Sequence, residues 1–455
     1  MTTVIAAIST PMAPAGLGVV RVSGEGAIEI AAQVFKPADE KRTLPNLSGY
    51  RAAYGHIVDA DGVIDECVAT VFRAPHSYTG EDVVEFSCHG GMYLLQRVLR
   101  ALFSAGAVPA TAGEFTRRAF LNGKIDLTQA ESVMTLIEAN GRLAAKTALT
   151  VREGALFQRL SGVKESLVGL QAQFSAFVDY PDDDIPELQH QELENALESA
   201  NTTLSELLKT YDAGRVLREG IDTAIIGSPN VGKSTVMNLL SGCERSIVTD
   251  IAGTTRDIVE ETVRVGEVCL RLSDTAGIRE TEDMVEALGV ERSRRRLETA
   301  ALILAVFDVS RPLSSDDTAL LACLPPETTI AILNKQDLAK CWDEQLVKQK
   351  FPHVITLNAI SGDGLEALIE AIHTVTGIDQ LCDAEPVLAT ERQRVCVCRA
   401  ANGIAEALTA LRAGMTLDAV SVSVDGAIGA VLELTGERTT EAVVDGIFSR
   451  FCVGK

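Results

Sequence analysis

The sequence predicts a multidomain α/β fold, with an N-terminal α+β domain and a helical bundle domain that is split by an inserted P-loop domain. Three observations lead to this prediction. Strand-like runs dominate the N-terminal part, apolar residues at heptad spacing follow, and residues 227–234 read GSPNVGKS. Helical patterns on both sides of a self-contained α/β segment indicate an insertion, which is tolerated where the inserted ends lie close together.

The N-terminal segment, residues 1–119, contains strand-like runs at 4–8, 18–22, 63–72 and 83–88. Asp61-Gly62, just before the third run, is typical of a tight hairpin turn. Apolar residues between 94 and 102 recur at helical spacing. We therefore expect an α+β domain here.

Residues 120–216 and 381–455 are predicted to form the two halves of the helical domain, and residues 217–380 the inserted P-loop domain. Apolar seams at 156–177 and 193–211 alternate steps of four and three residues. Long antiparallel helices packed as a bundle would bury both seams.

The composition limits the classes of function. A chain of 455 residues with 46% hydrophobic content suits several domains, each with its own core. The formal charge of −22 argues against tight unaided binding of nucleic acid. There is no basic signal segment, and no apolar run approaches the roughly 18 residues of a membrane span. We expect a cytoplasmic protein without a membrane part.

The GSPNVGKS stretch fits the phosphate-loop pattern at every fixed position. It follows a strand-like run and precedes a predicted helix, so backbone N–H groups and the positive end of the helix dipole would face a phosphate. Lys233 would neutralise phosphate charge, and the hydroxyl of Ser234 would bind Mg²⁺. This Lys-Ser pair argues against the alternative, a glycine-rich turn with no ligand.

Four further motifs follow in the order expected of a GTPase. A hydroxyl-rich loop spans 249–257, and the DTAG motif at 274–277 offers an Asp for Mg²⁺ and a Gly N–H for the γ-phosphate. Asp337 of the NKQD motif can accept two hydrogen bonds from guanine, which adenine does not offer. Residues 358–360 place a last N–H near the guanine carbonyl. The predicted GTP-binding residues are Asn230, Val231, Gly232, Lys233, Ser234, Thr235, Thr249, Asp250, Ile251, Ala252, Gly253, Thr254, Thr255, Asp274, Thr275, Ala276, Gly277, Asn334, Lys335, Asp337, Asn358, Ala359 and Ile360.

Hydrolysis needs a group that orients the attacking water. Ile278 stands where a glutamine would do this, so another group is required, and an acidic segment that includes Glu286 follows. The side-chain oxygen of Asn230 could help to bind a monovalent cation against the phosphates. It could equally stabilise the turn, and spacing alone leaves both interpretations open.

These motifs, with others along almost the whole chain, closely resemble the tRNA modification GTPase family called MnmE. The resemblance implies an N-terminal folate-binding domain that also dimerises, and a helical domain split by the G domain. It also implies a flavin-dependent partner protein, in a heterotetramer, and an aminomethyl-type group installed at C5 of the wobble uridine of certain tRNAs. The one-carbon donor would be 5-formyl- or 5,10-methylene-tetrahydrofolate. Other matching stretches are GVVRVSG at 18–24, SYTGEDV at 77–83, HGG at 89–91, GEFT at 113–116, AFLNGKIDL at 119–127 and FCVGK at 451–455.

The same resemblance maps the folate site to Arg21, Glu85, Lys124 and Lys455. Each of these charges could instead form an ordinary surface ion pair. Cys452 maps to a catalytic cysteine close to the folate, with a buried inert thiol as the alternative.

For the G domain, the resemblance makes Glu286 the carboxylate that acts through water in hydrolysis. It assigns Mg²⁺ to Ser234 and Thr255, and a K⁺ that promotes pairing of two G domains to a second set of residues. This K⁺ set is Asn230, Thr249, Ile251 and Thr254.

The expected function is a K⁺-stimulated GTPase, acting as a homodimer with a flavoprotein that supplies most of the affinity for tRNA. Two alternatives remain. A ribosome-assembly GTPase switch without one-carbon chemistry would leave the N-terminal motifs unused, and a folate-binding aminomethyltransferase with a regulatory G domain would use them.

Overall fold

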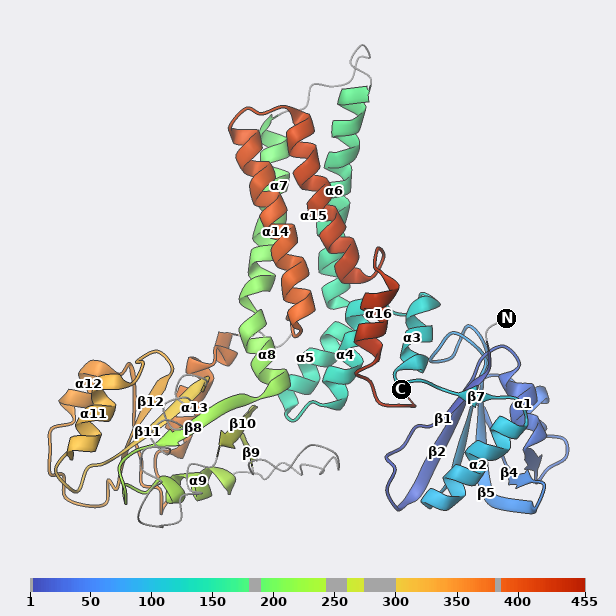
Figure 1. Cartoon of the computed structure of the whole chain (residues 1–455), viewed down its shortest axis with the longest axis horizontal. Coiled ribbons are helices and arrows are strands. Elements are labelled where there is room, and N and C mark those ends of the chain that lie inside the picture. Colours follow the sequence, from blue (N-terminus) through green and yellow to red (C-terminus); the bar gives the residue numbers. More distant parts are fainter. Residues whose placement is uncertain (1–2, 180–189, 243–259, 274–299, 381–385, 455) are drawn as a thin grey trace, which may run out of the picture. The chain divides into compact units, whose positions relative to one another are not determined.

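The computed structural model describes residues 3–179, 190–242, 260–273, 300–380 and 386–454 (Figure 1). The chain divides into two compact units, one of Met1–Met134 with Gly429–Lys455 and one of Thr135–Ile428. None of the helices in the described ranges combines the length and the apolar character that a membrane span requires.

The strands are β1 (Ile5–Ile8), β2 (Ala15–Ser23), β3 (Phe35–Pro37), β4 (Arg51–Asp59), β5 (Gly62–Phe72), β6 (Val83–Gly90), β7 (Val108–Pro109), β8 (Ile221–Ile226), β9 (Glu260–Val265), β10 (Val268–Ser273), β11 (Leu302–Asp308), β12 (Thr329–Asn334) and β13 (His353–Thr356). The helices are α1 (Ala27–Gln33), α2 (Met92–Ser104), α3 (Glu114–Leu121), α4 (Leu127–Ile137), α5 (Arg142–Arg152), α6 (Ala155–Asp179), α7 (His190–Lys209), α8 (Tyr211–Glu219), α9 (Lys233–Ser241), α11 (Ser315–Cys323), α12 (Gln345–Lys350), α13 (Leu365–Val375), α14 (Glu391–Arg412), α15 (Leu417–Thr435) and α16 (Glu441–Phe448).

The first unit contains a seven-stranded sheet in the order β3-β4-β5-β6-β2-β1-β7. Its neighbouring strands are antiparallel except for β1 and β7. β4 and β5 form the hairpin predicted at Asp61-Gly62. On β6, buried Val84, Phe86 and Cys88 alternate with more accessible residues, so one face of the sheet packs in the core with α1 and α2.

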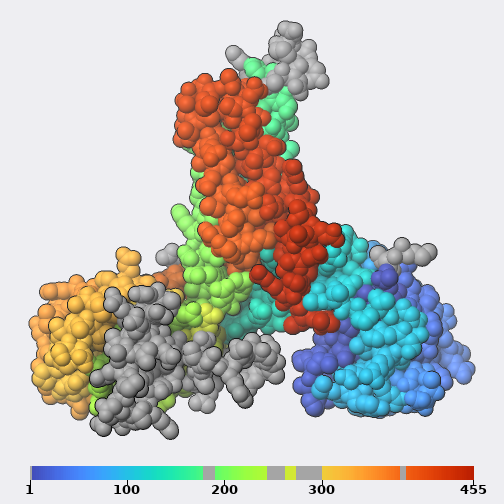
Figure 2. Space-filling view, viewed as in Figure 1, coloured from blue at the N-terminus to red at the C-terminus, as the bar shows by residue number. Residues whose placement is uncertain are grey.

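The C-terminal segment returns to the first unit. Helix α16 packs against α3, and Phe448 and Phe451 share a core cluster with Ala119. In the space-filling view the red C-terminal segment lies against the cyan segment that contains α3 (Figure 2). The hydroxyl of Ser9, just after β1, donates to the carbonyl of Gly454 over 3.1 Å. This bond places the end of the described chain beside β1.

In the second unit, α6, α7, α14 and part of α15 run side by side as long helices (Figure 1). The predicted seam of α6 is buried up to Phe174, whereas Phe177 in the last turn is 42% exposed. The second predicted seam is divided between two helices, since α7 ends before Tyr211 and α8 begins there. The Tyr211 hydroxyl donates to Glu391 at the start of α14 over 2.8 Å.

The second unit also holds a six-stranded sheet, in the order β13-β12-β11-β8-β10-β9, that is parallel except for β9 with β10. Every residue of β11 is buried, as expected for a strand covered on both faces. Helices α5, α8, α9 and α13 supply one core cluster, and α11 and α12 supply the other. The predicted fold class is confirmed.

The turn between β9 and β10 joins this sheet to helix α5. The Glu267 carboxylate accepts from the backbone N–H of Leu143 over 2.9 Å and from Nε of Arg142 over 3.4 Å. The first N–H groups of a helix have no partner within it, so Glu267 satisfies one of them at the start of α5. The backbone N–H of Glu267 lies 3.5 Å from Nε2 of His373 on α13.

We expect Glu267→Ala to lower the free energy of unfolding by about 1 kcal/mol, because it removes this cap. Chemical denaturation measures the change. Exposed Glu370 on α13 provides the control, and Glu370→Ala should change stability by less than about 0.5 kcal/mol. Equal losses in the two variants would contradict the role of Glu267.

Candidate functional site

The stretch 227–234 follows β8 and ends in the first turn of α9. Asn230 and Gly232 have positive φ angles of 62° and 100°. A Cβ added to Gly232 would lie 2.4 Å from Nδ2 of Asn334, so the close approach requires glycine. Nζ of Lys233 donates to the carbonyls of Gly227 and Ser228, over 2.9 Å each.

This arrangement fits a phosphate group. The N-terminal end of α9 offers backbone N–H groups without helical partners, and Lys233 adds an ammonium group beside them. Ser234 and Thr235 follow in the first helical turn, with Ser234 exposed. Val231 is fully buried and anchors the loop in the core of the sheet.

Asn334, the last residue of β12, links two loops. Its side chain is buried, Nδ2 donates to the carbonyl of Val231 over 2.9 Å, and Oδ1 accepts from the N–H of Ala359 over 3.1 Å. One amide thus connects the phosphate loop with the segment 358–360. A shorter or apolar side chain would leave both backbone groups without these partners.

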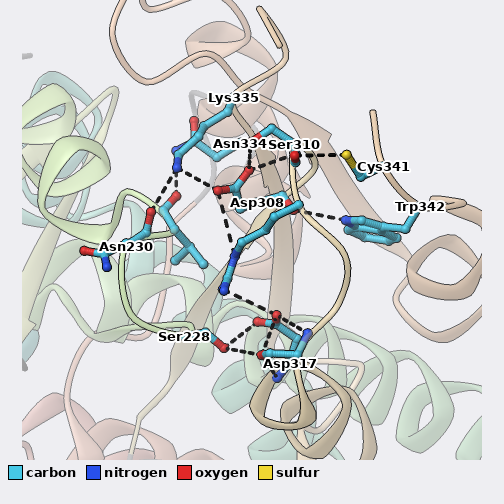
Figure 3. Close-up of polar contacts among 12 residues, drawn as sticks. Ser228, Asn230, Asp308, Ser310, Asp317, Asn334, Lys335, Cys341 and Trp342 are labelled. Atoms are coloured by element: carbon cyan, nitrogen blue, oxygen red, sulfur yellow. Dashed lines mark hydrogen bonds and ion pairs between the residues drawn. The ribbon is translucent and has the colours of Figure 1, made fainter. Parts of the chain in front are cut away.

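Lys335 forms a second link between the loops (Figure 3). Its φ of 64° turns the chain, and Nζ donates to the carbonyl of Asn230 over 2.9 Å and to Oδ2 of Asp308 over 2.6 Å. Asp308 also accepts from the N–H and the hydroxyl of Ser310. The indole N–H of Trp342 donates to the backbone carbonyl of Asp308 over 3.0 Å and so also belongs to this network.

Of the remaining predicted base-binding residues, Asp337 and Ile360 are exposed, Asn358 is half-buried and Ala359 is buried. Asp337 lies at the surface, three residues beyond β12. Oδ1 of Asn358 accepts from the N–H groups of Ile360 and Ser361 over 3.1 and 3.3 Å, which fixes the turn. The Ile360 side chain is 85% exposed.

Sequence reasoning missed both buried carboxylates beside the phosphate loop, Asp308 and Asp317. Oδ1 of Asp317, in the first turn of α11, accepts from the hydroxyl of Ser228 over 2.6 Å. Arg311 lies between the acids, 3.5 Å from Oδ2 of Asp317 and 3.9 Å from Oδ2 of Asp308. The Ser-x-x-Asp pattern of a capping box at 314–317 was the one local signal.

Burial raises the pKa of both Asp308 and Asp317. Hydrogen bonds from Lys335 and Ser310 to Asp308 outweigh it, as do those from Ser228 and Ser314 to Asp317 with the charge of Arg311, so each pKa lies below the ordinary 3.8. The ionised carboxylates therefore stabilise the folded state at pH values above the ordinary pKa. This contribution is lost as the pH falls through the lowered pKa. Burial also lowers the pKa of Lys233, as does the charge of Arg311, while Asp317 raises it.

Other predicted G-domain residues lie outside the described residues. These are the segment 249–255, the DTAG motif at 274–277 and Glu286. Within the described ranges, no group of three or more His, Cys, Asp and Glu side chains is placed to hold a metal ion.

In the first unit, Arg21 and Glu85 stand directly opposite each other on β2 and β6. Nε of Arg21 donates to Oε1 of Glu85 over 2.8 Å, and one terminal nitrogen of the same guanidinium lies 3.4 Å from the Gly454 carbonyl. The guanidinium also lies 5.3 and 5.5 Å from the ring centroids of Tyr78 and Phe115. This cation is therefore held by two rings and two acceptors in a partly buried position.

Lys124 and Cys452 also belong to the first unit, but their printed contacts are with other residues. Nζ of Lys124 donates to the carbonyls of Pro75 and Ser77, over 3.0 and 2.7 Å. Cys452 is exposed, and its carbonyl lies 3.4 Å from the N–H of Gly113. Lys455 lies outside the described residues.

A phosphate loop at the carboxyl end of a parallel strand, tied to an Asn-Lys pair at the end of another, defines a P-loop nucleotide-binding protein of the GTPase class. Comparison with known proteins agrees: residues 4–124 match the family model described as GTP-binding protein TrmE N-terminus, and residues 127–452 match MnmE helical domain. The chain belongs to the MnmE family.

Full-length relatives support this assignment. Proteins named tRNA modification GTPase MnmE from Natranaerobius thermophilus, Lactobacillus acidophilus and Clostridioides difficile are 39%, 40% and 37% identical to this chain. Each alignment covers 99% of this chain and at least 98% of the relative. The predicted family is confirmed, and so is the prediction of a GTP hydrolase at the level of that family. Among solved structures, an Aquifex aeolicus Era variant aligns over 40% of this chain and 66% of its own, with 25% identity and a TM-score of 0.27.

Proposed function

We propose that this chain binds and hydrolyses GTP and uses the cycle to drive modification of the wobble uridine of tRNA. The observation that carries the proposal is the junction of Asn334 and Lys335 with the phosphate loop. Asp337 follows Lys335 by two positions and is exposed, which supports a single site for its carboxylate and the phosphate loop. Asp337 would accept from the ring N–H and the exocyclic amine of guanine.

On the phosphate side, Lys233 would exchange the carbonyls of Gly227 and Ser228 for phosphate oxygens, which form stronger charge-assisted hydrogen bonds. Mg²⁺, held by Ser234 and Thr255, would supply further neutralisation of phosphate charge. The exposed Ser234 hydroxyl is accessible for this role.

A K⁺ ion would be held by Asn230 with Thr249, Ile251 and Thr254, and its charge would take the place of an arginine finger. The side-chain amide of Asn230 points away from Lys335, whereas its backbone carbonyl accepts from that lysine (Figure 3). Among the described residues, the side-chain oxygen of Asn230 takes no part in this loop network. Glu286 would orient the attacking water, and K⁺ would promote pairing of the G domains in a homodimer.

A tetrahydrofolate derivative would bind at Arg21 and Glu85, with contributions from Lys124 and Lys455. The guanidinium would bind folate carboxylates or a formyl oxygen, and Glu85 the amine edge of the pterin ring. The contact of Arg21 with the Gly454 carbonyl supports this site, because it brings the C-terminal segment with Cys452 to the same place. The donor would be 5-formyl- or 5,10-methylene-tetrahydrofolate.

The remaining assignments follow the names of the relatives and the charge of the chain. The relatives are named tRNA modification GTPases, and we extend the tRNA substrate to this chain. With a net charge of −22, most of the tRNA affinity would come from a flavin-dependent partner, in a cytoplasmic complex. A ribosome-assembly GTPase would leave the cluster around Arg21 without a role.

Asp337→Asn tests guanine recognition. The variant should lose about 100-fold in GTP affinity, because a carboxylate that accepts two hydrogen bonds becomes an amide. It should gain affinity for xanthosine triphosphate, whose exocyclic oxygen can accept from the new amide. Titration with fluorescent analogues of both nucleotides measures this change in preference. Retained preference for GTP would contradict the assignment.

GTP turnover in KCl and NaCl at matched ionic strength tests the hydrolysis mechanism. The unaltered protein should be faster in KCl, and Glu286→Ala should remove about 100-fold of the rate, the usual scale for a group that positions or deprotonates water. Equal rates in the two salts would direct attention to a partner-supplied arginine and to ribosome assembly.

Glu85→Gln tests the folate site. We expect its Kd for 5-formyl-tetrahydrofolate, measured by calorimetry, to rise about tenfold through loss of one charge-assisted contact. Glu66→Gln changes an exposed carboxylate on the adjacent strand β5 and serves as the matched control. Equal folate affinity in the two variants would show that Glu85 does not belong to the site. Absence of folate binding by the unaltered protein would favour the ribosome-assembly function.

A further inference from the structure

The phosphate loop has an attachment at Ser228 that its sequence pattern does not require. Ser228 occupies a variable position of the pattern, yet it is 3% exposed. Its hydroxyl donates to Oδ1 of Asp317 over 2.6 Å, and Oγ of Ser314 lies 3.2 Å from it. Ser228 and Asp317 are 89 positions apart in the chain. Figure 3 shows the two side chains pointing toward each other.

The cap of α11 uses only one of the two oxygens of the Asp317 carboxylate. Oδ2 accepts from the N–H and the hydroxyl of Ser314 over 2.9 and 2.8 Å, which completes the capping box of α11. Arg311 also approaches Oδ2, at 3.5 Å. Oδ1 is not needed for the cap, and it faces the phosphate loop. A residue that served only the helix would not have to be buried against Ser228.

Ser228, which Asp317 holds, also contacts Lys233. The backbone carbonyl of Ser228 is one of the two acceptors of Nζ of Lys233. A movement of Ser228 would therefore displace both this carbonyl and the loop in front of the phosphates. The later loop residues Asn230 and Val231 are held separately, by Lys335 and Asn334.

We propose that Asp317 is a positioning residue for nucleotide binding, which fixes the first half of the phosphate loop through the hydroxyl of Ser228. This inference rests on the proposed GTP site. When Lys233 leaves the carbonyls of Gly227 and Ser228 for a phosphate, Asp317 keeps Ser228 in place. The loop is thereby preorganised, and less conformational freedom is lost on binding.

Ser228→Ala tests the proposal, because it removes the contact with Oδ1 and leaves the capping box of α11 intact. The Kd for a fluorescent GDP analogue should rise about tenfold, as for loss of one hydrogen bond to a charged group. KM for GTP should rise by a similar factor while kcat changes much less, because a preorganised loop strengthens ground-state and transition-state binding alike.

Thr318→Gly is the control for an effect that acts only through the helix. Thr318 lies on the exposed face of α11, so this change weakens the helix without touching Ser228. It should lower the melting temperature but leave the Kd within about twofold. In a double-mutant cycle, Ser228→Ala and Asp317→Ala should be strongly non-additive in Kd, because each removes the same contact.

A Ser228→Ala variant that binds GDP as tightly as the unaltered protein would overturn the inference and leave the proposed function standing. Additive effects in the cycle would overturn it as well. Failure of the unaltered protein to bind guanine nucleotides would overturn both the inference and the proposed function.

Discussion

The carbonyl groups of the phosphate loop need hydrogen-bond donors, and the nucleotide site depends on how these are supplied. Lys233 serves the carbonyls at 227 and 228, Lys335 serves Asn230, and Asn334 serves Val231. Buried peptide groups must find partners within the protein or in water. Side chains bind these carbonyls from within the protein, whereas the first N–H groups of α9 have no partner within the helix.

The same contacts balance charge beside the loop. Two buried acids, Asp308 and Asp317, lie next to two cations, Lys335 and Arg311. Lys233, the first residue of α9, adds a third positive charge beside the loop. Salt screens charges over about 8 Å, so we expect this local balance to affect the attraction of a phosphate more than the net charge of −22 does.

In the first unit, protein groups likewise hold a cation in place, here at the proposed folate site. Arg21 is oriented by Glu85 across two strands and by the rings of Tyr78 and Phe115. The carbonyl of Gly454 then attaches the C-terminal segment to this cation and to Ser9. The positive φ of 97° at Gly454, and the 2.4 Å that would separate an added Cβ from the Ile8 carbonyl, explain why glycine stands there.

The sequence by itself determined the type of most elements, the phosphate loop and the hairpin at Asp61-Gly62, because periodicity and turn chemistry act over a few residues. Family motifs identified Arg21 and Glu85, but pairing of β2 with β6 was needed to place them opposite each other. Only the tertiary structure decided the contact of Ser228 with Asp317. That contact depends on which residues meet when strands β8 and β11 lie side by side, and no local pattern records such a meeting.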